Sequence, residues 1–192
     1  MPRTKDFDPA AAVDAAMDLF WTKGYEATSV DDLVRHLGVG RGSLYATFGS
    51  KHQLYLRALE RYRATVGGAV VAQIACGAPI RQALRVWLAT SIDSILGDPE
   101  RRGCIMVNAA AERGSCDPAA RRCVNSNAQS IEDALHAAIV RAQQAGDVSR
   151  DKDARALARF YLVTSQGLAL AAKTAERGTL QDTVEVALAA LD

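Results

Sequence analysis

Residues 38–51, GVGRGSLYATFGSK, gather the residue types that bind phosphate. Gly38, Gly40 and Gly42 lie within five positions, and Arg41 stands among them. Glycine leaves backbone amides accessible, and accessible amides together with a guanidinium can hold a phosphate group. That phosphate could belong to a nucleotide cofactor or to the backbone of a nucleic acid, and the spacing of the surrounding residues distinguishes the two.

The spacing of these glycines fits neither common nucleotide-binding loop. A dinucleotide-binding fingerprint reads G-x-G-x-x-G between a strand and a helix, whereas this chain reads G-x-G-x-G after a segment of helical periodicity. A P-loop requires Gly-Lys followed by Ser or Thr, and this does not follow the glycines. We therefore expect no nucleotide at this loop, and we predict no cofactor for the chain.

Two short amphipathic segments flank the glycines and explain them better. Leu33 and Leu37 share an apolar stripe before the turn, and Leu44 and Phe48 lie four residues apart after it. Two short helices joined by a glycine turn form a helix-turn-helix, whose second helix can enter the major groove of DNA. Arg41 at the start of that helix suits a guanine or a phosphate. The other outward-facing side chains are Ser43, Tyr45 and Thr47.

Helix start and stop signals recur along the whole chain. Asp8-Pro9 begins a helix that Gly24 ends, Thr28 or Ser29 begins the next, and Ser50 begins a long fourth helix. Five further helices are expected at residues 80–96, around 101–113, and over about 118–145, 151–168 and 179–191. No segment alternates with a period of two. The sequence therefore predicts an all-α protein of about nine helices.

The pattern of residues 11–54 resembles the DNA-binding domain of the TetR (tetracycline-repressor-like) family of transcriptional regulators. The matching residues are Ala15-Ala16, Leu19-Phe20, Gly24-Tyr25, Thr28-Ser29-Val30, Leu33, Gly38-Val39, Gly42-Ser43-Leu44-Tyr45, Phe48, Ser50-Lys51 and Leu54. The resemblance implies a helix-turn-helix domain over residues 1–50 and an effector-binding and dimerisation domain over residues 51–192. It also implies a homodimeric repressor that leaves a palindromic double-stranded DNA operator when a small-molecule effector binds.

The resemblance further assigns contacts with the duplex. The phosphate contacts that it implies are Thr28 or Ser29, Tyr45 and Lys51. The residues that it directs toward bases are Arg41, Gly42, Ser43 and Thr47. His52 lies where a further backbone contact is possible, or else it is a water-exposed residue in the first turn of its helix. Arg3 and Lys5 form either an arm that reaches the duplex or a disordered tail.

An effector pocket and a dimer interface are expected within residues 51–192. The ligand candidates combine apolar bodies with a few polar groups on the middle helices: Tyr62, Trp87, Cys104, Met106, Asn108 and Tyr161. The dimer candidates lie on the last two helices, where small residues allow close approach: Phe160, Gly167, Leu168, Ala171 and Leu188. For both sets the alternative is an ordinary core within one protomer.

Residues 101–114, RRGCIMVNAAAERG, contain a second informative feature. They resemble a subset of the family in which Gly-Cys followed by aliphatic residues opens the sixth helix, and some regulators of this subset respond to electrophiles or oxidants through a cysteine. Cys104 near a helix N-terminus and beside Arg101 and Arg102 would favour the thiolate that such a sensor needs. The alternative is a small buried apolar residue, which is the usual role of cysteine.

Composition and absent motifs argue against other classes of protein. The four cysteines form no CxxC pair and have no histidine at metal-ligand spacing, so we predict no metal site and reduced thiols in the cytoplasm. No apolar run approaches the roughly 18 residues of a membrane span. No paired carboxylates or nucleophile elbow indicate an enzyme. A non-DNA adaptor would be expected to lose the polar outer face, yet Arg41, Ser43, Tyr45 and Lys51 are all present.

Overall fold

The structure, a computed structural model, describes residues 7–192, so Arg3 and Lys5 lie outside the described part. Within this part the chain forms helices and no strand. The segments are α1 (Pro9–Lys23), α2 (Val30–Leu37), α3 (Arg41–Phe48), α4 (Lys51–Tyr62), the π-helical η1 (Arg63–Gly67), α5 (Gly68–Ala75), α6 (Ile80–Leu96), α7 (Ile105–Arg113), α8 (Pro118–Ala145), α9 (Ala154–Ala171) and α10 (Arg177–Ala189). Because α4, η1 and α5 run on without a break, residues 7–192 form nine continuous helices. The all-α prediction is confirmed.

Capping residues begin and end the first helices where the sequence indicated. The Asp8 carboxylate accepts the amide of Ala10 at 2.8 Å, and Ser29 and Asp32 form a reciprocal capping box at the start of α2. Gly38 ends α2 with a φ of +65°, the left-handed conformation that favours glycine. Aspartates also cap the starts of α8 and α9. Local sequence therefore fixes most helix boundaries.

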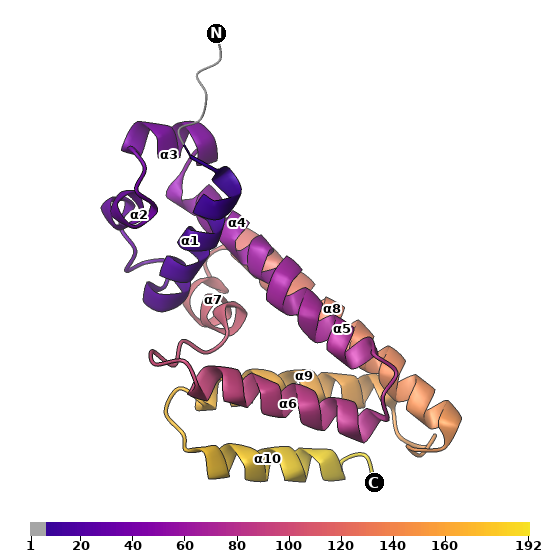
Figure 1. Ribbon diagram of the computed structural model, residues 1–192. Coiled ribbons are helices and arrows are strands. Elements are labelled where there is room, and N and C mark those ends of the chain that lie inside the picture. Colours follow the sequence, from indigo (N-terminus) through magenta and orange to yellow (C-terminus); the bar gives the residue numbers. More distant parts are fainter. Residues whose placement is uncertain (1–6) are drawn as a thin grey trace.

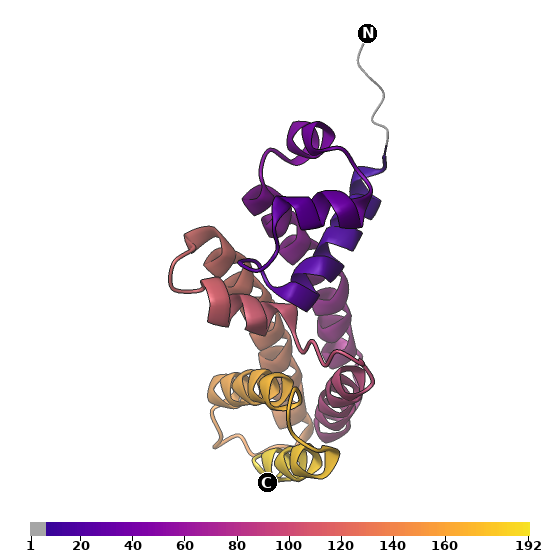
Figure 2. The ribbon, with the colours of Figure 1, turned by 90° about the vertical axis from the view of Figure 1, so that its left-hand side faces the viewer.

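The helices are arranged as two groups joined by a long rod (Figure 1). The first group is α1–α3, and the rod is the continuous helix of residues 51–75, called the α4–α5 rod below. The rod runs alongside α8 toward the second group, in which α6, α9 and α10 lie together. Helix α7 lies between the two groups, as the turned view in Figure 2 also shows. The first group is thereby held away from the bulk of the molecule.

Buried apolar side chains form two clusters. The N-terminal cluster joins α1–α4 to part of α7 and includes Phe20, Leu44 and Met106. The C-terminal cluster joins α5, α6 and α8–α10 and includes Leu135. Cys104 packs against both clusters, so α7 and the residue before it form the junction between the two groups. The division of the chain after residue 50 stays a prediction, because α4 and α7 share the N-terminal cluster.

The π-helical segment inside the α4–α5 rod was not predicted. At its end, Gly67 is buried against α8, and a Cβ on Gly67 would overlap the Oδ1 atom of Asn127. Asn127 is itself buried. The rod and α8 therefore come into close contact at a residue without a side chain, a relation that the sequence of neither helix reveals alone.

Candidate nucleic-acid interface

Helix α3 is anchored on one face and open on the other. Leu44 and Phe48 are almost fully buried, with 0% and 1% of their surface exposed. Arg41 and Gly42 are exposed at the start of the helix, and Tyr45 is exposed on its outer face. Ser43 and Thr47 are half-buried beside them. The predicted outer face of α3 is thus a polar surface that an elongated partner can reach.

The turn before α3 brings its N-terminus forward without a side chain in the way. Gly40 is the N-cap residue, and the backbone amide of Leu44 donates to its carbonyl oxygen at 2.9 Å. Val39 packs into the N-terminal cluster and thereby fixes α3 against α2. Because no Cβ projects from Gly40 or Gly42, the first amides of α3 remain approachable by a phosphate or a base edge.

Thr28 does not contribute to this surface, so its predicted phosphate contact is wrong. The residue is completely buried, and its hydroxyl donates to the Gly24 carbonyl oxygen at 2.6 Å. The neighbouring Ser29 is exposed and caps α2: its Oγ accepts the Asp32 amide at 3.0 Å. The Ser29 backbone amide and hydroxyl in turn lower the pKa of Asp32 to about 2. Ser29 stays a candidate for a phosphate contact.

Two cations share the ring of Tyr25, in the loop between α1 and α2. The Lys51 ammonium lies 4.2 Å from the ring centre, and the Arg113 guanidinium carbon lies 4.6 Å from it. Lys51 is the first residue of α4 and a predicted phosphate contact, whereas Arg113 is the last residue of α7. The Tyr25 ring therefore links the DNA-facing surface to α7 through cation–π contacts.

His52 connects the same two regions, and its backbone contact with DNA stays a prediction. Its Nε2 atom lies 2.8 Å from Oδ2 of Asp117, the N-cap of α8, while 38% of its side-chain surface stays exposed in the first turn of α4. Burial alone would raise the pKa of the Asp117 carboxyl, but the Ala120 amide and His52 together hold it below its usual value. His52 serves the junction between the two groups.

A carboxylate from α7 completes this junction. Glu112 accepts the backbone amides of Tyr25 and Glu26 at 2.9 and 2.8 Å, and Arg113 forms an ion pair with Glu26. Nothing in either stretch signals these contacts, because the partners lie 86 or 87 residues apart. Sequence reasoning missed them for that reason.

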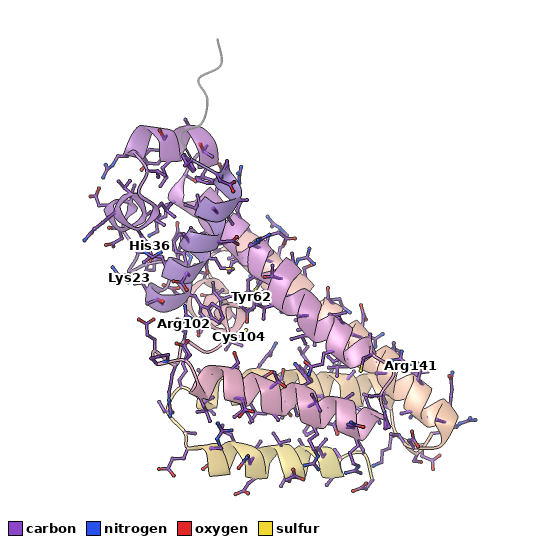
Figure 3. All side chains as sticks on the ribbon, in the orientation of Figure 1. Lys23, His36, Tyr62, Arg102, Cys104 and Arg141 are labelled. Atoms are coloured by element: carbon purple, nitrogen blue, oxygen red, sulfur yellow. The ribbon has the colours of Figure 1, made fainter. Side chains whose placement is uncertain are left out.

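The loop before α7 makes a second set of contacts with α1. Arg102 pairs with Asp98 at 2.7 Å and with Asp18 at 2.5 Å, and its guanidinium lies over the Trp21 ring. The Trp21 indole donates to the Gly103 carbonyl oxygen at 3.1 Å. Figure 3 shows Arg102 on the same side of the molecule as Tyr62 and Cys104, between α1 and α6. Residues 98–117 thus contact α1 and the loop after it, while α4 also packs on α1.

The six ligand candidates do not form one site. The Tyr62 hydroxyl lies 3.5 Å from Cys104 Sγ, and Met106 belongs to the same N-terminal cluster. Trp87 and Tyr161 instead lie in the C-terminal cluster, where the Tyr161 hydroxyl donates to the Ala187 carbonyl oxygen at 2.9 Å.

Burial raises the pKa of Tyr161 to about 12, consistent with a core residue. The Asn108 amide donates to the Arg102 carbonyl oxygen and supports a loop. Trp87 and Tyr161 thus pack in the C-terminal cluster, and the ligand roles of all six candidates stay predictions.

Two surface cavities lie away from these candidates. One of about 230 Å³ lies between α6 and α10 and is lined by Arg85, Asp93, Arg177 and Glu185, among others. One of about 470 Å³ lies between α1, α2 and the loop before α7 and is lined by Asp18, His36, Glu100 and Arg102, among others. Ion pairs lie at both cavities: Arg85 with Glu185 and Arg177 with Asp93 at the first, and Arg102 with Asp18 and Asp98 at the second.

The dimer candidates divide between the surface and the interior. Phe160 and Gly167 are exposed on α9, Ala171 is half-buried, and Leu168 and Leu188 are buried within the protomer. The interface roles of Leu168 and Leu188 are therefore wrong, since each packs in the C-terminal cluster. Three large exposed apolar residues were missed: Val163 and Leu170 on α9, and Val186 on α10.

In the described part of the chain, no helix is long and apolar enough to cross a membrane. The exposed recognition surface on α3 and the larger helical body behind it define the class of molecule: a helix-turn-helix DNA-binding protein. Family models agree. Residues 12–58 match "Bacterial regulatory proteins, tetR family", and residues 80–188 match "Tetracyclin repressor-like, C-terminal domain". The chain therefore belongs to the TetR family of transcriptional regulators, a family that is not enzymatic, and the resemblance of residues 11–54 is confirmed.

Relatives and solved structures agree with this assignment. The chain is 36% identical over 195 residues to the HTH-type transcriptional regulator YezE of Bacillus subtilis, covering all of both chains. It is 30% identical over 186 residues to the HTH-type transcriptional repressor ComR of Escherichia coli, covering 96% of this chain and 88% of ComR. A cysteine mutant of the TetR-family regulator CifR, solved with a 26-bp double-stranded operator, is 30% identical with a TM-score of 0.88, covering 99% of this chain and all of CifR.

Proposed function

We propose that this regulator is a homodimeric repressor that binds a palindromic operator and leaves it when a small effector binds. The observation that carries the proposal is the outward polar face of α3, formed by Arg41, Ser43, Tyr45 and Thr47 above the buried pair Leu44 and Phe48. Arginine can make paired hydrogen bonds to guanine, and hydroxyls and amides can hold phosphates. Lys51 at the start of α4 adds a charge beside this face.

Dimerisation supplies a second recognition helix. Phe160, Val163, Gly167 and Leu170 recur at spacings of three and four, so they form one exposed stripe along α9. An exposed apolar stripe of this kind favours contact with a second protein surface. One protomer offers few phosphate contacts and would bind weakly, whereas two protomers bind two half-sites at once. The 26-bp operator of CifR spans about two and a half turns of DNA, which has room for two half-sites.

Effector release requires a physical link between the two groups of helices. Residues 98–117 and the Tyr25 ring provide the candidate link, because they join α7 and the start of α8 to α1, to the loop after it and to α4. An effector that moves α7 would shift these contacts and so change the spacing of the two recognition helices.

A second candidate function is electrophile or oxidant sensing through Cys104. Cys104 is the N-cap residue of α7, and the Tyr62 hydroxyl lies within donating distance of its sulfur. Burial and the neighbouring thiol raise the pKa of Tyr62, so its hydroxyl stays protonated and can donate a hydrogen bond to a thiolate. Cys104 also packs against both clusters, so an adduct there would disturb the junction.

Two experiments test these roles separately. Selection of DNA from a random pool should return a palindrome with two equal half-sites, and a pool without enrichment would contradict operator binding. For Cys104, mass spectrometry after mild quinone or peroxide treatment should find the thiol modified and the operator released, with Cys104→Ser as the resistant control. An unmodified Cys104 in protein that still binds its operator would end the sensor proposal.

A further inference from the structure

An ion pair crosses the turn of the helix-turn-helix. Asp31 is the second residue of α2, and Arg41 is the first residue of α3. Oδ1 of Asp31 accepts a hydrogen bond from Nη2 of Arg41 at 2.5 Å. The pair therefore joins the helix in front of the turn to the predicted base-reading arginine behind it.

The ion pair is poorly placed to stabilise the fold. The Arg41 and Asp31 side chains are 56% and 73% exposed, and exposed pairs contribute little to the free energy of unfolding. Asp31 is not needed as a cap either, because Ser29 and Asp32 form the capping box of α2. A carboxylate on this surface also repels DNA phosphates, which weakens binding to any sequence. Asp31 also lies in the first turn of α2, where the helix dipole favours a carboxylate modestly. Its effect on Arg41 is the consequence that bears on base recognition.

We propose that Asp31 is a positioning residue that holds Arg41 for a guanine and so sets the sequence preference of the operator. The inference rests on the proposed function, in which α3 enters the major groove. A guanidinium has five N–H groups, so one bond to Asp31 leaves enough for a paired contact with guanine O6 and N7. A fixed guanidinium is confined to one register, whereas a free one can also turn toward a phosphate.

A matched pair elsewhere separates this role from a general effect of charge. Asp14 on α1 pairs with Arg61 at 2.6 Å, and both side chains are also exposed, at 43% and 45%. Asp14→Asn removes the same charge and breaks the same type of ion pair without touching α3. Asp31→Glu keeps the charge but moves the carboxylate, so it changes position alone.

The experiment measures binding of the full-length protein to its selected operator, to every single-base variant of that operator and to unrelated DNA at fixed salt. Asp31→Asn should lower discrimination at one G·C pair in each half-site by about tenfold. It should also raise affinity for unrelated DNA, because a repelling charge is lost. Asp31→Glu should lose discrimination without that rise, and Asp14→Asn should leave discrimination unchanged. A purely structural role would weaken binding to all sequences together.

A double-mutant cycle tests whether Asp31 acts through Arg41. Arg41→Lys should lose the same discrimination, and adding Asp31→Asn should then lower discrimination no further, although the general rise in affinity from the lost charge should remain. Wild-type discrimination in Asp31→Asn would overturn the inference. So would a further loss in the Arg41→Lys background, because Asp31 would then contact a base itself. A wild-type protein with no sequence preference would instead overturn the proposed function on which the inference rests.

Discussion

Polar contacts in the two parts of the molecule differ in their reach along the sequence. Within α1–α3, Ser29 and Asp32 are three residues apart and Asp31 and Arg41 are ten apart. At the junction, His52 and Asp117 are 65 residues apart, and Glu112 contacts the amide of Tyr25 from 87 residues away. Polar contacts within α1–α3, the recognition unit, thus join residues that are near neighbours in sequence. The contacts that attach this unit to the rest of the protein join residues that only the completed fold brings together.

This difference teaches where function can be changed independently of folding. Substitutions on the outer face of α3 touch few other groups, so they should alter DNA binding with little effect on stability. Substitutions at the junction remove contacts between distant segments, so they should alter stability and effector response together. The following predictions probe both parts and the surface that joins two protomers, from the largest expected effect to the smallest.

The largest effect is expected at the dimer surface. Val163→Asp places a carboxylate in the middle of the exposed stripe on α9, where a symmetric interface would bury two unpaired charges. The dimer should dissociate to monomers, and operator affinity should fall by at least about 100-fold, since a monomer has one recognition helix instead of two. Analytical ultracentrifugation and gel shift measure the two changes.

Val66→Asp serves as the control for Val163→Asp. Val66 is an exposed valine of the η1 segment, on the α4–α5 rod rather than on α9. The Val66→Asp protein should remain dimeric and bind the operator normally. A dimeric Val163→Asp protein with normal affinity would place the interface elsewhere.

Removal of Tyr45 and Lys51 should weaken the operator complex by about 100-fold, because each residue is expected to hold a phosphate in both half-sites. The two residues differ in kind, which sharpens the test. Lys51→Ala should reduce the slope of log K against log salt by about two for the dimer, since one cation is lost per protomer. Tyr45→Phe should lower affinity and leave that slope unchanged.

Titrating the salt concentration in a gel shift separates these outcomes. If the double variant Tyr45→Ala, Lys51→Ala keeps normal operator affinity, α3 and the start of α4 do not face the DNA backbone. Gln53→Ala is the control, because Gln53 lies in the first turn of α4, as Lys51 does, and its side chain is exposed but uncharged.

Glu112→Ala should lower the free energy of unfolding by about 2 kcal/mol, because two backbone amides lose a charged acceptor. Urea unfolding followed by circular dichroism measures the change. Glu185→Ala, which removes the exposed pair with Arg85, should change stability by less than about 0.5 kcal/mol. Equal effects of the two variants would show that the junction depends little on Glu112.

The same contrast explains how much could be predicted from the sequence. Helical spacing alone puts Leu44 and Phe48 on one face and so predicts that both belong to the core. Thr28 and Ser29 were both plausible caps, and only the fold decides that the first is buried and the second exposed. Tyr161 has a polar group like that of a ligand site, yet its hydroxyl is used by a carbonyl oxygen of α10, 26 residues away.

The dimer stripe shows a related limit. A search for small residues finds Gly167 but misses Val163 and Leu170, because exposure of an apolar residue depends on which face of α9 the rest of the chain covers. The junction at Glu112 and Arg113 was missed for the same reason. Spacing identifies contacts within a helix or across one turn, and contacts between distant segments need the packing of the intervening helices.

The smallest predicted effect lies within the recognition unit itself. Ser29→Ala removes the N-cap of α2 and should lower the free energy of unfolding by about 1 kcal/mol at neutral pH. It also removes the hydroxyl that helps to hold the pKa of Asp32 at about 2, so this pKa should rise toward its ordinary value of 3.8. A carboxyl with a lowered pKa stabilises the fold above its unfolded pKa and loses that contribution as the pH falls through its folded pKa.

In the wild type the Asp32 contribution should therefore persist to about pH 4 and disappear toward pH 2, whereas the variant should show a weaker dependence in that window. Carbon-detected NMR titration of the Asp32 carboxyl and acid unfolding measure the two quantities. Because Ser29 and Asp32 are only three residues apart, their capping contact should form in an isolated α1–α3 unit as readily as in the whole protein. The contact of Glu112 with the amides of Tyr25 and Glu26 should not form there. An unchanged Asp32 pKa in Ser29→Ala would show that groups further along the chain set this pKa, such as Lys23, whose Nζ lies 3.2 Å from Oδ1 of Asp32. The polar contacts within α1–α3 would then not depend only on near neighbours in sequence.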